Sequence, residues 1–150
     1  MSALLLAGLA GCMKKEDPFV DRVVAPVLVV IDNATGDGGG QTGEPVVSQK
    51  VAGPVTLGVK IYELDKSGIL NNTVGIDSIP VTSLAITLTT RAGVAIGNLT
   101  TDGTGRASVS KTWAELGIAA PKAGSTVSLT WTGEYKGQAF SRLSRVQAIN

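Results

Sequence analysis

Large aliphatic residues recur at every second position along several segments of this chain, and that period of two constrains the fold more than any other feature. The clearest segment is residues 55–62, in which the odd positions are all apolar: Val55, Leu57, Val59 and Ile61. Residues 84–89 and 127–132 show the same alternation. Because successive side chains of a strand point to opposite faces, each segment predicts a strand with one buried face. No long segment has the 3.6-residue period of a helix, so we expect an all-β protein.

Three short segments rich in turn-forming residues separate the predicted strands. Residues 91–93 and 102–105 predict two consecutive hairpins, because they contain residues that tolerate positive φ. Residues 135–138 predict a further hairpin between the last two strands. Strands at this spacing are typical of an antiparallel β-sandwich, here with about seven strands.

Two other connections have different predicted roles. Residues 66–79 are polar and too long for a tight hairpin, so we expect them to cross between the two sheets. Residues 112–117 begin with Thr112, carry Glu115 three residues later and end with Gly117, a pattern that predicts one short helical turn. A single turn of this kind connects strands and adds no helical layer.

The first 45 residues differ in composition from the rest of the chain. Residues 19–31 are rich in valine and predict one or two short strands, whereas residues 33–45 contain five glycines and predict a flexible linker or long loop. We therefore expect a signal peptide at 1–11, a lipidated tether with a first strand and this loop at 12–45, and a sandwich at 46–150. A chain of 150 residues has room for one such domain.

An apolar run ends at the only cysteine of the chain. Residues 4–9 are too few to span a membrane, which takes about 20 apolar residues, but they suit a secretory signal peptide. Leu9-Ala10-Gly11-Cys12 resembles the lipobox of bacterial lipoproteins, which implies that Cys12 becomes the lipidated N-terminus. The alternative is that Cys12 is a small buried apolar residue. No basic residue precedes the run, which leaves open that the signal peptide is truncated.

Charged residues follow soon after Cys12. Residues 14–17, Lys-Lys-Glu-Asp, resemble the short surface-export signal of Bacteroidota lipoproteins, and Met13 is not the aspartate of an inner-membrane retention signal. The resemblance implies an outer-membrane lipoprotein of the cell envelope, exposed at the cell surface. A charged stretch after a cleavage site is also typical of a simple solvated tether, which remains the alternative.

One part of the predicted sandwich resembles known domains. It runs from DSIPV at 77–81 through a threonine-rich strand to TTDGTGRASV at 100–109. This pattern is similar to bacterial immunoglobulin-like domains of the invasin and intimin type, and also to transthyretin-like or carboxypeptidase-regulatory-like sandwiches. The resemblance covers about residues 55–146 and leaves open which of the two topologies applies. It implies a stalk, adhesion or accessory module.

Histidine is absent from the whole chain. Its absence removes the commonest metal ligand, the usual general base near neutral pH and every catalytic arrangement that pairs histidine with serine or cysteine. Glu63 and Asp65 are candidates for an acid–base pair at a strand end, where carboxylates are usually solvated. Asp32, Asn33 and Asp37 offer oxygen ligands but match no complete calcium loop. We expect no enzyme activity, no cofactor and no metal site.

The charges of the chain nearly cancel. Thirteen basic residues stand against twelve acidic ones, for a formal net charge of +1. Lys136, Arg142 and Arg145 give the last hairpin only a mild basic character, too little for a polyanion site. We therefore expect no nucleic-acid partner.

Aromatic side chains are the candidates for a ligand surface, because carbohydrate-binding sandwiches stack such rings on sugars. The candidate ligand-facing residues are Tyr62, Trp113 and Tyr135. For Trp113 the alternative is a plug at one end of the sandwich. Trp131 is instead expected in the core, because it follows Val127 and Leu129 at period two.

Together these observations predict a non-enzymatic, lipid-anchored cell-envelope protein with a structural or adhesive module. The alternative is a module that binds carbohydrate or another ligand. The expected partners are the membrane, through the lipid anchor, and a protein or glycan that the sequence does not specify.

Overall fold

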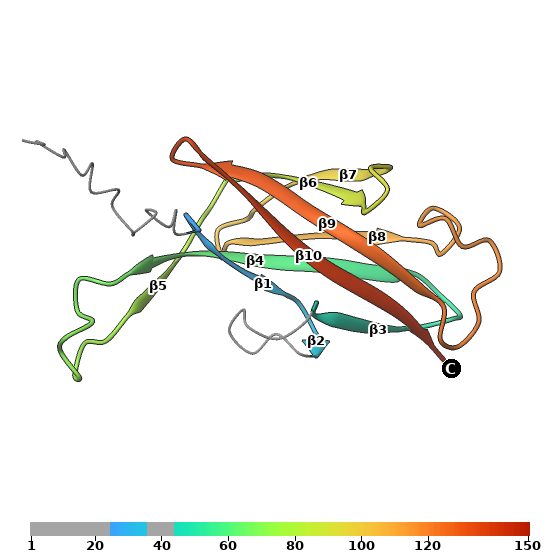
Figure 1. Cartoon of the computed structure of the whole chain (residues 1–150), viewed down its shortest axis with the longest axis horizontal. Coiled ribbons are helices and arrows are strands. Elements are labelled where there is room, and N and C mark those ends of the chain that lie inside the picture. Colours follow the sequence, from blue (N-terminus) through green and yellow to red (C-terminus); the bar gives the residue numbers. More distant parts are fainter. Residues whose placement is uncertain (1–24, 36–43) are drawn as a thin grey trace, which may run out of the picture.

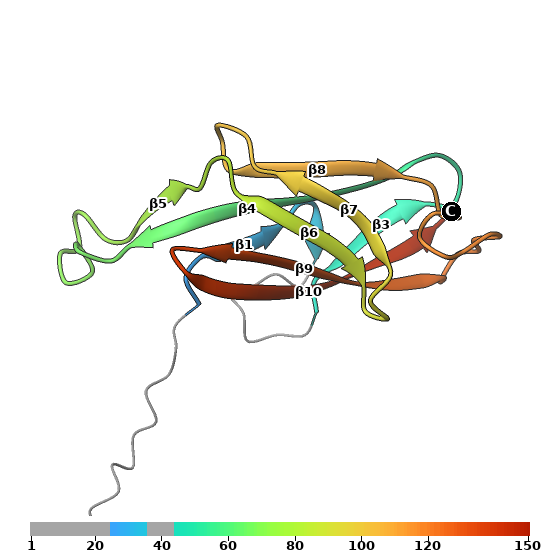
Figure 2. The same ribbon diagram turned by 90° about the horizontal axis from the view of Figure 1, so that it is seen from above.

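The computed structural model describes residues 25–35 and 44–150, and within these ranges the chain forms ten strands and no helix (Figure 1). The strands belong to two sheets, one of four strands and one of six. Figure 2 shows the sheets as two layers, with β4 and β8 in one layer and β9 and β10 in the other. The predicted all-β sandwich is confirmed, although it has ten strands rather than about seven.

The four-stranded sheet is built on one long strand, β4 (Val55–Asp65). One edge of β4 pairs with β1 (Leu28–Ile31), and the other edge pairs with β8 (Arg106–Lys111) and then with β5 (Asp77–Pro80), all antiparallel. No other pairing holds β1, β5 or β8 among the described strands of this sheet. The whole layer therefore depends on β4.

The edge of β4 changes partner at Ile61. Its N–H donates to the carbonyl of Gly105, and its own carbonyl accepts from the N–H of Val81, each at 2.9 Å. Gly105 has a φ of 75°, and a Cβ added there would lie 2.6 Å from the Ile61 carbonyl oxygen. This junction therefore requires glycine, which alone lets the backbones approach so closely at positive φ.

The six-stranded sheet follows the order β2-β3-β10-β9-β6-β7. Its strands are β2 (Ala34–Thr35), β3 (Val46–Lys50), β6 (Ala85–Thr90), β7 (Ala95–Thr100), β9 (Thr126–Tyr135) and β10 (Gln138–Ile149). The hairpins predicted at residues 91–93 and 135–138 are confirmed. Lys136 and Gly137 both have positive φ, as a tight two-residue hairpin turn requires.

One strand pair departs from the predicted antiparallel arrangement. β3 runs parallel to β10, with Val46 opposite Arg145 and Lys50 opposite Ile149. Because the two strands are parallel, they end at the same end of the sandwich, where a short connection at 51–54 leads from β3 into β4 of the facing sheet. The larger sheet is therefore mixed.

The core fills the space between the two sheets with the apolar sides of the predicted alternating segments. On β4, Val55, Leu57, Val59 and Ile61 are all buried. The facing sheet contributes Ile86, Leu88, Leu129, Trp131 and Val146. The buried faces predicted from the alternation are thereby confirmed.

Trp131 has the largest of the fully buried side chains in the described chain, with 1% of its surface exposed. Its indole Nε1–H donates to Ser144 Oγ on the neighbouring strand at 2.9 Å, and Ser144 is itself 1% exposed. A buried N–H without a partner would be costly, so this bond lets an indole occupy the core. The core position predicted for Trp131 is confirmed.

The sandwich begins earlier than the boundary expected at residue 46. β1 lies in the four-stranded sheet, and Val29 and Ile31 belong to the core. The described strand of the valine-rich run, β1, is therefore part of the domain, because the edge of β4 offers it both hydrogen bonds and burial. The expected signal peptide at 1–11, most of the tether and the greater part of the glycine-rich loop lie outside the described residues.

The turn at residues 102–105 forms but does not produce the predicted hairpin. Asp102 Oδ1 accepts the N–H groups of Thr104 and Arg106 at 2.8 and 3.0 Å, as its turn chemistry predicts. The flanking strands nevertheless diverge into different sheets, because β7 pairs with β6 whereas β8 pairs with β4. The turn is therefore a corner between the two layers.

Residues 66–79 also differ from their predicted role as a crossover. Residues 66–76 form a loop that joins β4 to β5 within one sheet, and residues 77–80 are themselves β5. The crossover follows at residues 81–84 and is held by Thr101, whose hydroxyl donates to Val81 O at 2.7 Å and accepts from Leu84 N at 2.8 Å. Buried Thr101 thus ties the crossover to the facing sheet.

The sandwich is elongated, and its two ends carry different segments (Figures 1 and 2). At the end where the chain enters β1, called here the N-terminal end, lie the β4–β5 loop and the β9–β10 turn. At the opposite end, called here the C-terminal end, lie the C-terminus, the β6–β7 turn and the connection between β8 and β9.

We expect Trp131→Ala to lower the free energy of unfolding by about 3–5 kcal/mol, because it removes a fully buried aromatic side chain. Trp131→Phe should cost less but still destabilise, since it leaves the buried Ser144 hydroxyl without its donor. Val94→Ala, at an exposed turn position, is the control and should stay within about 0.5 kcal/mol of the parent. Denaturant melts measure all three; equal midpoints for the two alanine variants would contradict the core assignment.

Candidate functional site

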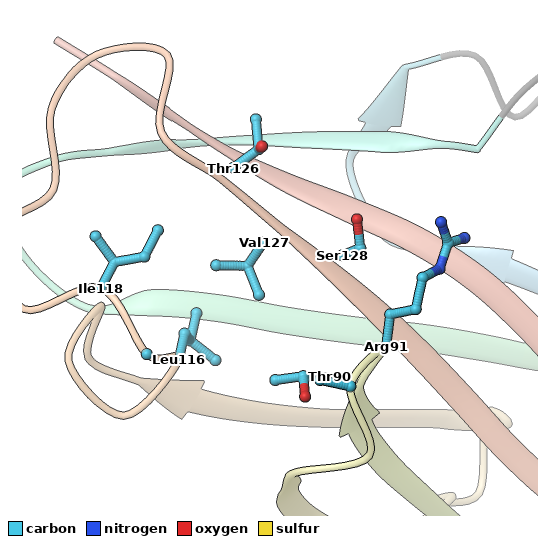
Figure 3. Close-up of a pocket in the computed structure, with 9 residues that line it drawn as sticks. Thr90, Arg91, Leu116, Ile118, Thr126, Val127 and Ser128 are labelled. Atoms are coloured by element: carbon cyan, nitrogen blue, oxygen red, sulfur yellow. The ribbon is translucent and has the colours of Figure 1, made fainter.

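A groove of about 620 Å³ opens at the C-terminal end of the sandwich (Figure 3). It lies where the end of β6 and the start of β9 meet the connection that follows β8. The lining residues are Thr90, Arg91, Ala92, Leu116, Gly117, Ile118, Thr126, Val127 and Ser128. Figure 3 shows Leu116, Ile118 and Val127 grouped on one side, with the Arg91 side chain directed away from them.

The apolar wall of the groove is positioned by the turn at residues 112–117. Leu116 N donates to Thr112 O at 3.2 Å and Ile118 N donates to Trp113 O at 2.8 Å, so the chain closes one tight turn. This turn is not a helix, because the backbone leaves it at Gly117, whose φ is 92°. Leu116 is buried beneath the groove, and Ile118 is half-buried at its side.

A reciprocal pair of side-chain contacts caps that turn, as the sequence predicts. Glu115 Oε2 accepts the N–H of Thr112 at 2.8 Å and its hydroxyl at 2.9 Å, and Glu115 N donates back to Thr112 Oγ1. Lys111 Nζ adds a contact to Glu115 Oε1 at 3.2 Å. These bonds favour the ionised carboxylate; the Thr112 backbone is the largest cause, and they lower the pKa of Glu115 to about 2.

The polar side of the groove is an ion-pair cluster. Arg91 and Arg145 both contact Glu44, the latter with 3.5 Å between Nη2 and Oε2. Arg91 N also donates to Ser128 O at 2.9 Å, which fixes the end of β6 against β9. The guanidinium of Arg91 is therefore already partnered within the protein.

The groove suits contact with an apolar group and offers little for proton transfer. Among its nine lining residues, Arg91 has the only titratable side chain, and an arginine stays protonated in proteins. The hydroxyls of Thr90, Thr126 and Ser128 supply hydrogen-bonding groups at the rim. Such a surface can bind the apolar part of a partner but lacks a general base.

The candidate aromatic Tyr135 belongs to a different cluster, at the N-terminal end. Its hydroxyl donates to Glu63 Oε2 at 2.6 Å, and Lys136 Nζ donates to Glu63 Oε1. The Lys136 ammonium also lies 5.2 Å from the centre of the Tyr135 ring. These contacts lower the pKa of Glu63, with the Lys136 hydrogen bond as the largest cause, and raise the pKa of Tyr135 through its bond to Glu63.

The three aromatic residues predicted to face a ligand do not form a common surface. Trp113 is 3% exposed and donates its Nε1–H to Lys50 O at 3.0 Å, so it plugs the sandwich and cannot stack on a ligand. Tyr62 is half-buried on β4, opposite Leu28 and Pro80. Because Tyr62 immediately precedes Glu63 in a strand, its side chain points to the opposite face from the cluster that contains Tyr135.

The other residues considered from the sequence are engaged in local contacts. Asp65 Oδ1 accepts Ser67 N at 2.8 Å, which lowers the pKa of Asp65. Since the pKa of Glu63 is lowered too, neither carboxyl of the pair is held protonated as a general acid must be. Asp32 contacts Arg106 and Lys60, and Asn33 forms a turn at positive φ.

Asp37 and Cys12 lie outside the described residues. Within the described ranges, no group of three or more possible metal-ligating side chains occurs. No helix in those ranges is long and apolar enough to span a membrane.

Sequence reasoning did not find the groove, because its residues come from three segments that only the tertiary structure brings together. The one local signal was Ile118, an apolar residue directly after the glycine that ends the predicted turn. An apolar residue at that point indicates packing against another element, but not which element.

Comparisons with known proteins returned no relative: no family model, no curated protein and no solved structure matches the chain. The resemblances to bacterial lipoproteins and to immunoglobulin-like or transthyretin-like sandwiches therefore stay predictions.

The low pKa of Glu115 predicts a pH-dependent contribution to stability. The carboxyl has a pKa of about 2 in the folded chain against an ordinary value of 4.5, so its stabilisation is present above pH 4.5 and is lost as the pH falls towards 2. Glu115→Gln should therefore melt below the parent at pH 7, and the difference should shrink between pH 4.5 and 2. Thermal melts at several pH values test this; a gap that stays constant down to pH 2 would contradict the capping role.

Proposed function

We propose that this chain is a non-enzymatic, lipid-anchored protein of the cell envelope whose sandwich serves as a structural or adhesive module. The observation that carries the proposal is Cys12, which follows an apolar run and small residues and precedes a charged stretch. Residues 13–27 separate Cys12 from the first strand, and fully extended they would reach about 50 Å. A lipid on Cys12 would therefore hold the sandwich close to the membrane.

The arrangement of the two ends supports an adhesive role. The chain enters the sandwich at the N-terminal end, whereas the groove lies at the C-terminal end. An anchor at Cys12 would attach the membrane to the N-terminal end, so the groove would lie at the end farther from the point of attachment. The rim hydroxyls and the apolar wall would then be available to a partner outside the membrane.

The chemistry of the described side chains favours binding over catalysis. The chain has no histidine, the groove has no general base, and Glu63 and Asp65 both have lowered pKa values. These features support a module that makes contacts rather than one that transforms a substrate.

A ligand-binding module is the second candidate, and the groove is the observation that favours it. Its volume is within the range of small-molecule sites, although the groove is shallow and open to solvent. Carbohydrate recognition by ring stacking is the less favoured form of this alternative, because no aromatic side chain lines the groove and Trp113 is buried. An occupant with an apolar part suits Leu116, Ile118 and Val127 better.

The anchor is tested by metabolic labelling of cells that express the chain with a fatty-acid analogue. We expect the protein to take up label and to fractionate with membranes, and Cys12→Ala to abolish the labelling. Leu9→Asp, which disrupts the apolar side of the motif but keeps the cysteine, is a second test of the motif and should also prevent labelling. Label that persists in Cys12→Ala, or a mature N-terminus at another residue, would contradict the proposal.

A further inference from the structure

The loop between β4 and β5 carries a group of exposed large apolar side chains, among them the two most exposed of the described chain, Leu70 and Val74. Four of them are 48–98% exposed and together are called the apolar tip: Ile69, Leu70, Val74 and Ile76. Leu70 alone is 98% exposed. No charged residue occurs from Ser67 to Ile76. The apolar side chains lie on either side of the exposed polar residues 71–73. Uncharged segments with several exposed apolar side chains mark a contact surface.

The loop projects beyond the rest of the sandwich at the N-terminal end (Figures 1 and 2). It is a convex tip rather than a groove or a flat face, so a rigid protein surface could cover only part of it. A lipid bilayer, which deforms around an inserted group, can surround such a tip on all sides.

Part of the loop backbone is suited to an apolar environment, because several of its N–H groups donate to acceptors within the loop. Ile69 N donates to Lys66 O at 3.0 Å and Asn71 N to Gly68 O at 2.8 Å. On the returning arm, the N–H groups of Val74 and Gly75 both donate to Asn71 O, at 3.1 and 2.8 Å. Unsatisfied backbone groups are what makes lipid contact costly for a loop, and these bonds reduce that cost.

The two arms of the loop are also packed against each other. A Cβ added at Gly68 would lie 2.5 Å from Val74 Cγ1 and 2.7 Å from Gly75 O, so Gly68 allows the arms to touch. At the base, Asp65 Oδ1 accepts Ser67 N at 2.8 Å. The tip is thereby held in one shape with its apolar side chains outward.

We propose that the apolar tip inserts into the interfacial region of a lipid bilayer and fixes the orientation of the sandwich on the membrane. The proposal rests on the proposed function, in which a lipid on Cys12 brings this chain to a bilayer. The chain enters β1 at the same end from which the tip projects. Anchor and tip would therefore contact the same membrane surface, and each raises the effective concentration of the other.

The charges around the loop indicate that insertion depends on apolar contact rather than on anionic lipid. Asp65, Lys66 and Asp77 flank the loop and sum to −1, while Lys136 is already paired with Glu63. Binding should therefore be no stronger to anionic vesicles than to neutral ones. It should also persist at high salt, which screens charge interactions but not apolar burial.

The test uses the full chain with Cys12→Ala, so that no acyl group contributes, and phosphatidylcholine vesicles. We expect the partition coefficient to fall about tenfold or more when Leu70→Ser is added. Val94→Ser, at another exposed apolar position, between β6 and β7, is the control and should leave the partition coefficient within about twofold. The Cys12→Ala chain and its two serine variants all contain residues 4–9, so any affinity of that segment for lipid is the same in the three measurements. An equal loss in both serine variants, or none in Leu70→Ser, would overturn the proposal.

A second measurement locates the tip directly. Leu70→Trp should show blue-shifted emission on the vesicles and quenching by brominated lipid, whereas Val94→Trp should show neither. The buried Trp113 and Trp131 contribute the same background to both chains. If Leu70→Trp is instead buried without vesicles, with a dimer in sedimentation, a second copy covers the tip and the proposal is wrong.

The two proposals fail separately. Labelling of Cys12 without Leu70-dependent partition would retain the anchor and overturn the inserted tip. Leu70-dependent partition without labelling would retain the tip as a membrane contact and overturn the anchor.

Discussion

The inner face of β4 carries four buried aliphatic side chains at alternating positions, and the rest of the molecule is arranged around that face. They pack against the facing sheet, where Trp131 and its bond to Ser144 occupy the core. The edges of β4 hold β1, β5 and β8, none of which has another partner in the described part of that sheet. Burial on one face and pairing on both edges are therefore properties of the same strand, and a loss at β4 would release an entire layer.

The length of β4 explains the projecting loop. The strand has 11 residues, and its last four pair with β5 at the N-terminal end. Every residue of β5 is exposed, so this part of the sheet has little of the second layer over it. Apolar side chains on a sheet that extends past its partner have no core to enter. In this chain the excess forms the apolar tip, and the turns of the loop satisfy part of its backbone.

At the C-terminal end, by contrast, the connection between β8 and β9 covers the space between the two layers. Trp113 and Leu116 on the segment after β8 are buried, and Glu115 caps the turn that presents them. The groove is the space left beside this closure, between the turn, the end of β6 and the start of β9. Its shape thus depends on packing at one end of the sandwich, and its apolar wall is an extension of the core.

The sequence by itself determined the all-β class, the buried faces, the core position of Trp131, two hairpins and the capped turn, because each depends on residues close together in the chain. Tertiary structure decided which sheet each strand joins. The Asp102–Gly105 turn formed as expected, yet it became a corner because β8 found its partner in β4 rather than in β7. The parallel pairing of β3 with β10, the place of β1 in the core, and the groove likewise depend on contacts between distant segments. Local patterns specify which side of a strand is buried, but the choice of neighbour is set by the packing of the whole chain.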